Sequence, residues 1–335
     1  MTWTREKLYH RHRLSHRQID DLLGVAHQGD EMAEKVTQLE KLRFFFQVAQ
    51  DLIKANIWFV VLKGPLLSQR LYKDPTYRYY KDFDFLLNPE DVTQAIELLE
   101  QAGLKPLNFH WPKSISQQNK VLGYLNQINL VNEETGLSIE LHWKLFHWKV
   151  VAPSAMREHI LSNTEELTLS GIQFKVLSPE FELLYLIIHG GLHAWFRLKW
   201  LVDIQVFLRL GLIDVGKFKK LVRDFKAEKI VALAAALLED QLQNRTNLGF
   251  QKYLDHSTFV FCQERLLSEH ELPYHDIHSF RKHLQYKWRL FPNMSYKLSL
   301  LKFSTFRDKE VNHSSLPLHP VSALAQRAWD RIWGK

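Results

Sequence analysis

The six residues Asp82 to Leu87, DFDFLL, constrain the fold of this chain more than any other segment. They begin as a strict polar and apolar alternation, which is typical of a β-strand with one wet face and one buried face. On such a strand the carboxylates of Asp82 and Asp84 project from one face, while Phe83 and Phe85 pack inward. Two ionised carboxylates about 6–7 Å apart repel by roughly 2–3 kcal/mol at an effective dielectric constant near 20, so some partner must offset their charge.

A divalent cation offsets this repulsion directly. Mg²⁺ takes oxygen ligands, commonly one or two carboxylates together with water and substrate phosphates. The alternative is that both aspartates face water or pair with Arg78 and Lys81. A later segment, SIELH, alternates in the same way, so Glu140 is expected on the same side of a neighbouring strand, with His142 on its face. The candidate metal ligands and catalytic residues are therefore Asp82, Asp84 and Glu140.

The pattern around these segments predicts a mixed α/β region. An apolar stripe predicts a helix over residues 30–55, formed by Val36, Leu39, Leu42, Phe46, Ala49 and Ile53. Strands are expected at 58–62, 82–87, 121–131 and 137–143, and helices at 65–71 and 88–103. After Pro179 the spacing becomes helical, with helices expected at 180–189, 193–210, 215–225, 230–243, 252–268 and 323–333.

Composition excludes several classes of protein. The chain has 335 residues, of which 46% are hydrophobic, and this is ordinary globular composition. Cys262 is the one cysteine, so neither an internal disulfide nor a cysteine-rich zinc site can form. No apolar run reaches the roughly 20 residues that span a bilayer, so we expect a cytoplasmic protein without a membrane partner. The net charge of +7 leaves nucleic-acid binding open, but the basic residues are scattered and do not favour it.

The turn after the first predicted strand carries a phosphate-binding signal. Lys63 and Gly64 stand where backbone N–H groups and a lysine side chain can approach a phosphate. At this point the segments VVLKGPLL, YRYYKDFDFLL and SIELHWKLF, followed by the helical LSPEFELLYLIIHGGLHAWFRLKWLVDI, resemble an uncharacterised bacterial nucleotidyltransferase family of the polymerase-beta-like superfamily. The resemblance covers residues 35–210. Many superfamily members have Gly-Ser in this turn, whereas this chain has Gly64 followed by Pro65.

The resemblance implies an α+β fold, with a polymerase-beta-like core of mixed sheet and flanking helices followed by an all-helical domain. The expected division is a helical segment at 1–56, the catalytic core at 57–177 and the helical domain at 178–335. It also implies two Mg²⁺ ions on the three acidic residues and transfer of a nucleoside monophosphate from an NTP to an acceptor, which is a sugar, a small metabolite, a peptide or a protein. Lys63, Gly64, Arg78 and His142 would contact the nucleotide. A degenerate nucleotide- or partner-binding protein of the same fold is the alternative.

Three other residues attract a functional reading that the sequence does not settle. His189 and His193 are four apart, but Gly190 and Gly191 between them favour a helix break over a zinc site. Asp203 lies within an apolar helical pattern, where a buried carboxylate needs a partner such as Lys199 or Arg209. We expect a structural ion pair at Asp203.

Overall fold

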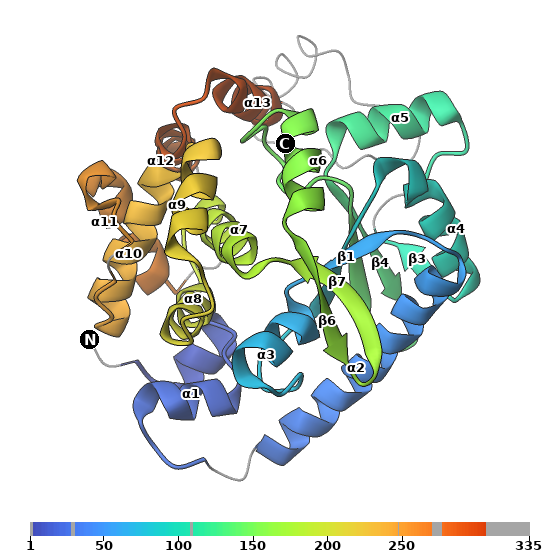
Figure 1. Ribbon diagram of the computed structural model, residues 1–335, viewed down its shortest axis with the longest axis horizontal. Helices are drawn as coiled ribbons and strands as arrows, with labels where there is room; N and C mark the ends of the chain where they lie inside the picture. Colours follow the sequence, from blue (N-terminus) through green and yellow to red (C-terminus); the bar gives the residue numbers. More distant parts are fainter. Residues whose placement is uncertain (1–2, 28–30, 108–109, 247, 270–276, 306–335) are drawn as a thin grey trace. The chain divides into compact units, whose positions relative to one another are not determined.

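The computed structural model describes residues 3–27, 31–107, 110–246, 248–269 and 277–305 (Figure 1). Within these residues the chain forms two compact units. The first unit contains the described parts of Met1–Leu42, Lys63–Tyr80 and Val150–Asn293, and the second contains those of Arg43–Leu62, Lys81–Lys149 and Met294–Lys335. Because each unit combines separate stretches, the linear division at residues 57 and 178 stays a proposal. The helix expected at 323–333 lies outside the described residues.

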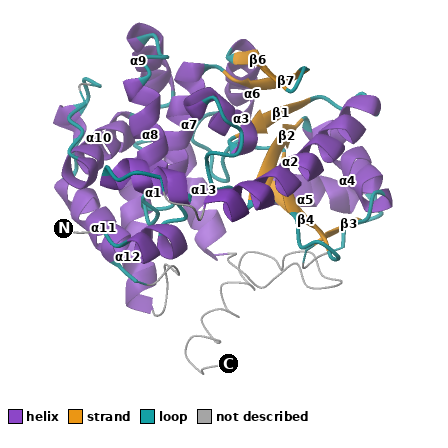
Figure 2. Cartoon of the chain, turned by 90° about the horizontal axis from the view of Figure 1, so that it is seen from below, coloured by secondary structure: helices purple, strands orange, loops and turns teal. Residues whose placement is uncertain are grey.

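The second unit is built on a five-stranded mixed sheet (Figure 2). The strand order is β1-β2-β5-β4-β3. β2 and β5 run parallel, and the other neighbouring strands are antiparallel. The strands are β1 (Phe59–Leu62), β2 (Asp82–Leu87), β3 (Leu104–Pro106), β4 (Gln127–Asn132) and β5 (Ser138–His142). The parallel pair thus places two strands that are far apart in sequence side by side in the sheet.

One face of this sheet is apolar because of the alternation in β2. Phe83 and Phe85 are buried, and the ring centroid of Phe45 on α2 (Glu31–Lys54) lies 5.4 and 5.6 Å from theirs. The other helices of the unit are α4 (Val92–Gln101), α5 (Ile115–Tyr124) and α13 (Met294–Thr305). The aromatic contacts hold α2 against the apolar face and leave the aspartates on the opposite face.

The buried side of α2 differs from the predicted stripe. Val36, Leu39 and Ile53 are exposed, at 50%, 49% and 47%. Leu42 and Ala49 of the predicted stripe are buried, together with Phe45, Val48 and Leu52, which the stripe did not include. Both stripes have helical spacing, and the contact of Phe45 with the phenylalanine rings of β2 selects the buried one.

The first unit is mostly helical. It contains α1 (His16–Leu23), α3 (Gly64–Tyr72), α6 (Pro153–Ser162), α7 (Pro179–Leu192), α8 (Lys199–Arg209), α9 (Val215–Asp224), α10 (Glu228–Leu242), α11 (His256–Leu267) and α12 (Ile277–Leu290). It also contains a hairpin of β6 (Thr164–Leu169) and β7 (Ile172–Leu177), which the sequence reading did not predict. Ser170 and Gly171 between them both have positive φ, at 51° and 80°, as a two-residue hairpin turn requires. The expected α+β class, a mixed sheet with helices followed by a helical region, is confirmed.

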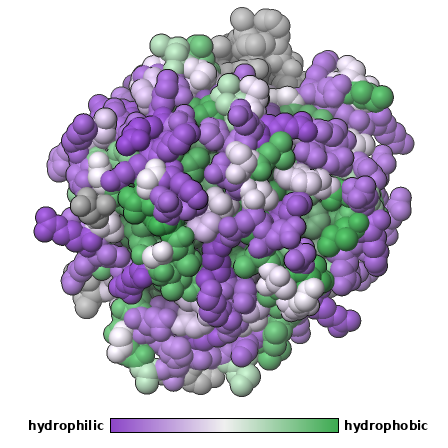
Figure 3. Space-filling model, viewed as in Figure 1, coloured by the Kyte–Doolittle hydropathy of each residue, from purple (hydrophilic) through white to green (hydrophobic). Residues whose placement is uncertain are grey.

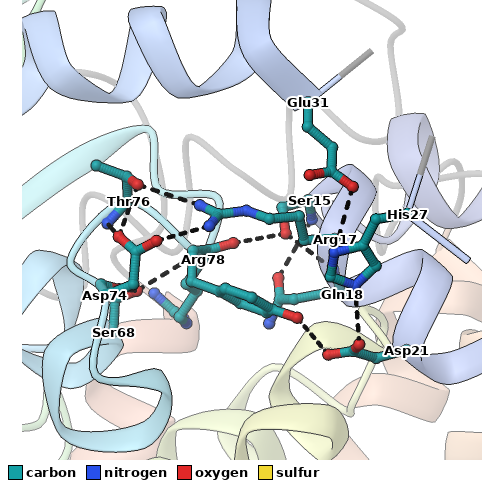
Figure 4. A network of polar contacts seen from close by, with 11 residues as sticks. Ser15, Arg17, Gln18, Asp21, His27, Glu31, Ser68, Asp74, Thr76 and Arg78 are labelled. Atoms are coloured by element: carbon teal, nitrogen blue, oxygen red, sulfur yellow. Dashed lines mark hydrogen bonds and ion pairs between the residues drawn. The ribbon is translucent and has the colours of Figure 1, made fainter. Parts of the chain in front are cut away.

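A polar network holds α1 to the segment that leads toward β2 (Figure 4). The Ser15 hydroxyl donates to the carbonyl oxygen of Tyr77 at 2.6 Å. The Arg17 guanidinium donates to Asp74 at 2.6 Å and to the Thr76 hydroxyl at 3.1 Å. These bonds fix residues 74–77, which contain no regular secondary structure of their own.

Residues 121–124 are helical, although the sequence predicted a strand from Val121. They form the last turn of α5, and β4 begins at Gln127. The Trp143 indole N–H donates to the carbonyl oxygens of Leu122 and Leu125, both at 2.9 Å, where the helix ends. The strand alternation itself starts only at Gln127, so the apolar residues before it were misread as strand.

Gly190 and Gly191 do not break α7, which continues to Leu192. A Cβ on Gly190 would lie 2.4 Å from the Trp195 ring, and one on Gly191 would lie 2.2 Å from Ile230. The glycines therefore permit close packing inside a continuous helix. The break follows them, and α8 begins only at Lys199.

No helix in the described part of the chain is long and apolar enough to cross a membrane. On the face shown in Figure 3, hydrophobic side chains lie in separate groups among hydrophilic ones.

Candidate metal and active site

Polar side chains line up across three strands on the second face of the sheet. The register pairs Asp84 of β2 with Glu140 of β5, and Glu140 with Asn129 of β4. Two residues further along β5, His142 pairs with Gln127 of β4. Because paired residues project from the same side of a sheet, all five side chains share one face. The fold thereby gathers two acids and an imidazole from strands distant in sequence.

His142 connects the two acids. Its Nε2 atom lies 3.0 Å from Oδ1 of Asp84 and 3.3 Å from Oε2 of Glu140. The Gln127 side-chain amide donates to the same Oε2 of Glu140 at 2.6 Å. Asp84 and His142 are buried, whereas Glu140 keeps partial access to solvent. The carboxylates are thus held in place by neighbours on the same face.

The donor set fits a divalent cation. One ligand atom each from Asp84, Glu140 and His142 lies within 4.8 Å of the others. Around one ion with bonds of about 2.1 Å, neighbouring octahedral ligand atoms stand about 3 Å apart, which is close to the two distances at His142. The Nδ1 atom of His142 is buried and has no hydrogen-bond partner among the described residues. Carboxylate oxygens suit Mg²⁺ or Mn²⁺, and the imidazole nitrogen favours a transition ion.

The electrostatics of the site follow from this crowding. Burial raises the pKa of Glu140, and the negative charges of Asp84 and Asp82 raise it further against the opposing effect of His142. Burial would lower the pKa of His142, but its hydrogen bonds to Asp84 and Glu140 outweigh that effect and raise the pKa to about 9. An imidazolium therefore neutralises part of the acidic charge, in the place where a cation would do the same.

Asp82 lies two residues before Asp84 on β2, opposite Ser138 of β5, and is half-buried. It acts on Glu140 through its charge but lies outside the three-residue group. Lys63 and Gly64 directly follow Leu62, which pairs with Asp84 across β1 and β2. Both have positive φ, at 55° and 51°, and both belong to the first unit. Their contact with phosphate stays a prediction.

Arg78 takes a structural position in the first unit. Its guanidinium donates to both carboxylate oxygens of Asp203 at 2.7–2.9 Å, and both residues are buried. Asp203 is thus in an ion pair, as expected, but its partner is Arg78 and neither Lys199 nor Arg209. A guanidinium committed to a buried carboxylate is poorly placed to bind a phosphate, so the structure gives no support to that role for Arg78.

His189 and His193 lie near each other at the end of α7, with ring centroids 4.7 Å apart. Trp200 lies 5.5 Å from each ring. The two histidines are not part of a metal-binding group within the described residues. Their surroundings are aromatic.

Gln127 and Asn129 were not singled out from the sequence. The amide of Gln127 also lies 3.3 Å from the side-chain oxygen of Asn129, which makes both part of the polar face. The alternation Gln-Ile-Asn-Leu at 127–130 carries the same signal as DFDF. Amide side chains alone indicate no particular chemistry, so this alternation predicts a polar strand face without predicting a site.

One family of known proteins resembles this chain. The sequence model of a family described as "Uncharacterised nucleotidyltransferase" matches residues 28–243. A solved structure of an antigenic nucleotidyltransferase-like protein from Paracoccidioides brasiliensis is 13% identical, with 63% of this chain and 92% of that chain covered and a TM-score of 0.33. No curated protein matches the chain. The family match includes every strand of the sheet together with Asp84, Glu140 and His142.

Proposed function

Because the chain belongs to the family of uncharacterised nucleotidyltransferases, we propose that it transfers a nucleoside monophosphate from an NTP to an acceptor hydroxyl. The observation that carries this proposal is the parallel pairing of β2 with β5, which sets Asp84 opposite Glu140 on a polar sheet face. The acceptor is a sugar, a small metabolite, a peptide or a protein. The reaction fits a cytoplasmic enzyme that uses an NTP as co-substrate.

In the proposed reaction the acceptor oxygen forms a bond to the α-phosphorus, and the bond from that phosphorus to the bridging oxygen breaks. Pyrophosphate leaves with the electron pair of the broken bond. The hydroxyl proton passes to Glu140 or to water.

Asp82, Asp84 and Glu140 would hold two Mg²⁺ ions, with His142 as a further ligand or as the group that orients Asp84. When bound, the ions supply positive charge that stabilises the attacking and leaving oxygens. The amide of Gln127, 2.6 Å from Glu140, keeps that carboxylate in one orientation. Lys63 and Gly64 would contact the phosphate chain, as the position after β1 suggests.

Calorimetric titration with ATP, GTP, CTP and UTP tests the proposal. We expect one of the four to bind in the presence of Mg²⁺ and binding to disappear with excess EDTA. Asp84→Asn should remove the metal-dependent part of the binding. If none of the four binds with Mg²⁺ present, the proposal is wrong.

Two further measurements separate the alternatives. A degenerate protein of this fold would bind the NTP but release no pyrophosphate with any acceptor extract. A nucleic-acid-binding protein would instead bind an oligonucleotide, with an affinity that falls steeply as salt is added.

A further inference from the structure

The hydrogen bonds at Glu140 continue beyond the candidate metal site. The amide nitrogen of Gln127 lies 2.6 Å from Oε2 of Glu140, and the amide oxygen of Gln127 accepts a hydrogen bond from the side chain of Asn126 at 2.9 Å. The side-chain oxygen of Asn126 in turn lies 2.7 Å from Nδ1 of His147. We call Asn126, Gln127 and His147 the amide relay. All three lie in the second unit, as Glu140 does.

Glu140 sets the direction of every hydrogen bond in the amide relay. An ionised carboxylate only accepts hydrogen bonds, so Gln127 presents its amide NH₂ group to Glu140 and its oxygen to Asn126. That oxygen needs an N–H from Asn126, so Asn126 presents its own oxygen to His147. Nδ1 of His147 must then carry a proton. Each amide therefore has one orientation, and His147 is the donor at the outer end of the series.

The amide of Gln127 has partners on all sides. Its nitrogen also donates to the side-chain oxygen of Asn129 at 3.3 Å, so its two N–H groups have two acceptors. A reversed Gln127 would turn its oxygen toward both the Glu140 carboxylate and the oxygen of Asn129. Such contacts leave half-buried polar groups without partners, and this costs free energy. The hydrogen bond from Asn126 opposes that reversal.

The backbone holds Asn126 and His147 where the amide relay needs them. The carbonyl oxygen of Asn126 accepts hydrogen bonds from the backbone N–H groups of Trp143 and Lys144, at 2.9 and 3.3 Å. The Lys144 ammonium donates to the carbonyl oxygen of Leu125 at 2.9 Å. The segment that follows β5 and carries His147 is therefore tied to the end of α5, which precedes Asn126.

We propose that Asn126 and His147 are positioning residues, which act through the amide of Gln127 and hold the Glu140 carboxylate in the orientation that binds a divalent cation. The inference rests on the proposed function, because it takes Glu140 as a metal ligand. Groups that hydrogen-bond to metal ligands orient them, and their loss commonly lowers metal affinity about 10–100-fold. The amide relay extends this control by two residues, to an imidazole that is half-exposed.

The test is the affinity of the full chain for Mn²⁺ alone, which takes the same oxygen ligands as Mg²⁺. The electron paramagnetic resonance signal of the free ion reports binding as MnCl₂ is added. Asn126→Asp keeps the shape of the side chain but offers only acceptors, so it draws the NH₂ group of Gln127 away from Glu140. We expect Mn²⁺ to bind about 10-fold more weakly. The added negative charge alone would strengthen cation binding, so a loss points to the reversed amide.

A double substitution separates positioning from a general structural effect. If Asn126 acts through Gln127, adding Asn126→Asp to Gln127→Ala should weaken Mn²⁺ binding no further, whereas independent effects would add in free energy. Asn119→Asp is the matched control, since Asn119 is an exposed asparagine on α5 of the same unit. It should bind Mn²⁺ as the unaltered protein does.

Two variants test the outer end of the amide relay. His147→Leu removes the donor to Asn126 and should weaken Mn²⁺ binding at least about threefold. His147→Asn keeps an N–H group near the position of Nδ1, so it should restore most of that loss. A residue that served only to fill space would show no such difference between leucine and asparagine.

Circular dichroism and the melting temperature show whether each variant is folded. If Asn126→Asp is unfolded, His147→Leu and His147→Asn decide the outcome. Undiminished Mn²⁺ affinity in the folded variants would overturn the inference and leave the proposed function standing, as would an equal loss from Asn126→Asp with and without Gln127. An unaltered protein that binds no Mn²⁺ would instead refute the metal site of the proposed function, and the inference with it.

Discussion

The Nε2 atom of His142 lies 3.0 Å from Oδ1 of Asp84, and both side chains are buried in the sheet. The same Nε2 atom lies 3.3 Å from Oε2 of Glu140, the second acidic neighbour of His142. A positively charged His142 offsets part of the acidic charge in the protein without metal. A bound cation would take over that role and leave His142 to act through its nitrogen lone pair.

Asp84→Asn should abolish turnover while the fold survives. Asparagine has nearly the same shape and keeps an oxygen that can accept a hydrogen bond from His142, but it lacks the charge that holds a cation. We expect the rate of pyrophosphate release to fall at least about 1,000-fold, which corresponds to about 4 kcal/mol of barrier. The melting temperature should change little.

Glu100→Gln is the matched control, since Glu100 is an exposed acid on α4 of the same unit. It should leave the rate unchanged. Near-normal turnover by Asp84→Asn would show that the assignment of the metal site is wrong.

The faces of the strands could be predicted because they depend on neighbours in sequence. The alternation in DFDFLL and SIELH places Asp84 and Glu140 on the polar faces of their strands, and Phe83 and Phe85 on the apolar face, whatever the arrangement of the strands in the sheet. The register of β2 against β5, which sets Asp84 opposite Glu140, is a long-range property that alternation leaves open.

The partner of the buried Asp203 carboxylate could not be predicted from the sequence for the same reason. Asp203 was expected to pair with a residue on its own helix, whereas Arg78 is 125 positions away. Burial makes some partner necessary, but only the packed structure selects it. The role of Gly190 and Gly191 in α7 depends on packing in the same way. Trp195 and Ile230 occupy the space that a Cβ at these positions would need, and only the folded structure shows that they do.

Asp203→Asn should strongly destabilise the first unit. The substitution leaves the Arg78 guanidinium buried without its carboxylate, and breaking a buried pair on one side costs about 3–5 kcal/mol. Urea unfolding followed by circular dichroism measures this loss. Asp224→Asn removes an exposed pair with Lys220 and should cost less than about 1 kcal/mol. Equal losses in the two variants would contradict a buried structural role for the Arg78–Asp203 pair.

His12 should make stability depend on pH below neutrality. Its Nδ1 accepts a hydrogen bond from the Leu198 N–H at 3.1 Å, which requires that nitrogen to be unprotonated. Burial and the charges of Arg11, Lys7 and Arg197 lower the pKa of His12 to about 3. In the unfolded chain the pKa is about 6.5, so the unfolded state binds the extra proton first as pH falls.

The stabilising effect of a neutral His12 is therefore complete above about pH 6.5 and is lost as pH falls toward 3. From pH 7 to pH 5 the loss is about 2 kcal/mol. The free energy of unfolding of the native protein and of His12→Gln, measured at both pH values, should differ in its pH dependence by that amount. An identical pH dependence in both proteins would show that His12 is not the group responsible.

Gly190→Ala should destabilise the protein although alanine is the better helix former. The added Cβ would lie 2.4 Å from the Trp195 ring, which is fully buried, so neither side can move without cost. Overpacking of this kind typically costs about 1–3 kcal/mol. Gly123→Ala in α5 is the matched control, because a Cβ there meets nothing within 4 Å. Alanine should stabilise that helix by about 0.5–1 kcal/mol through its propensity. Thermal unfolding of the two variants should thus shift in opposite directions, and a shift in the same direction would mean that Gly190 does not serve close packing against Trp195.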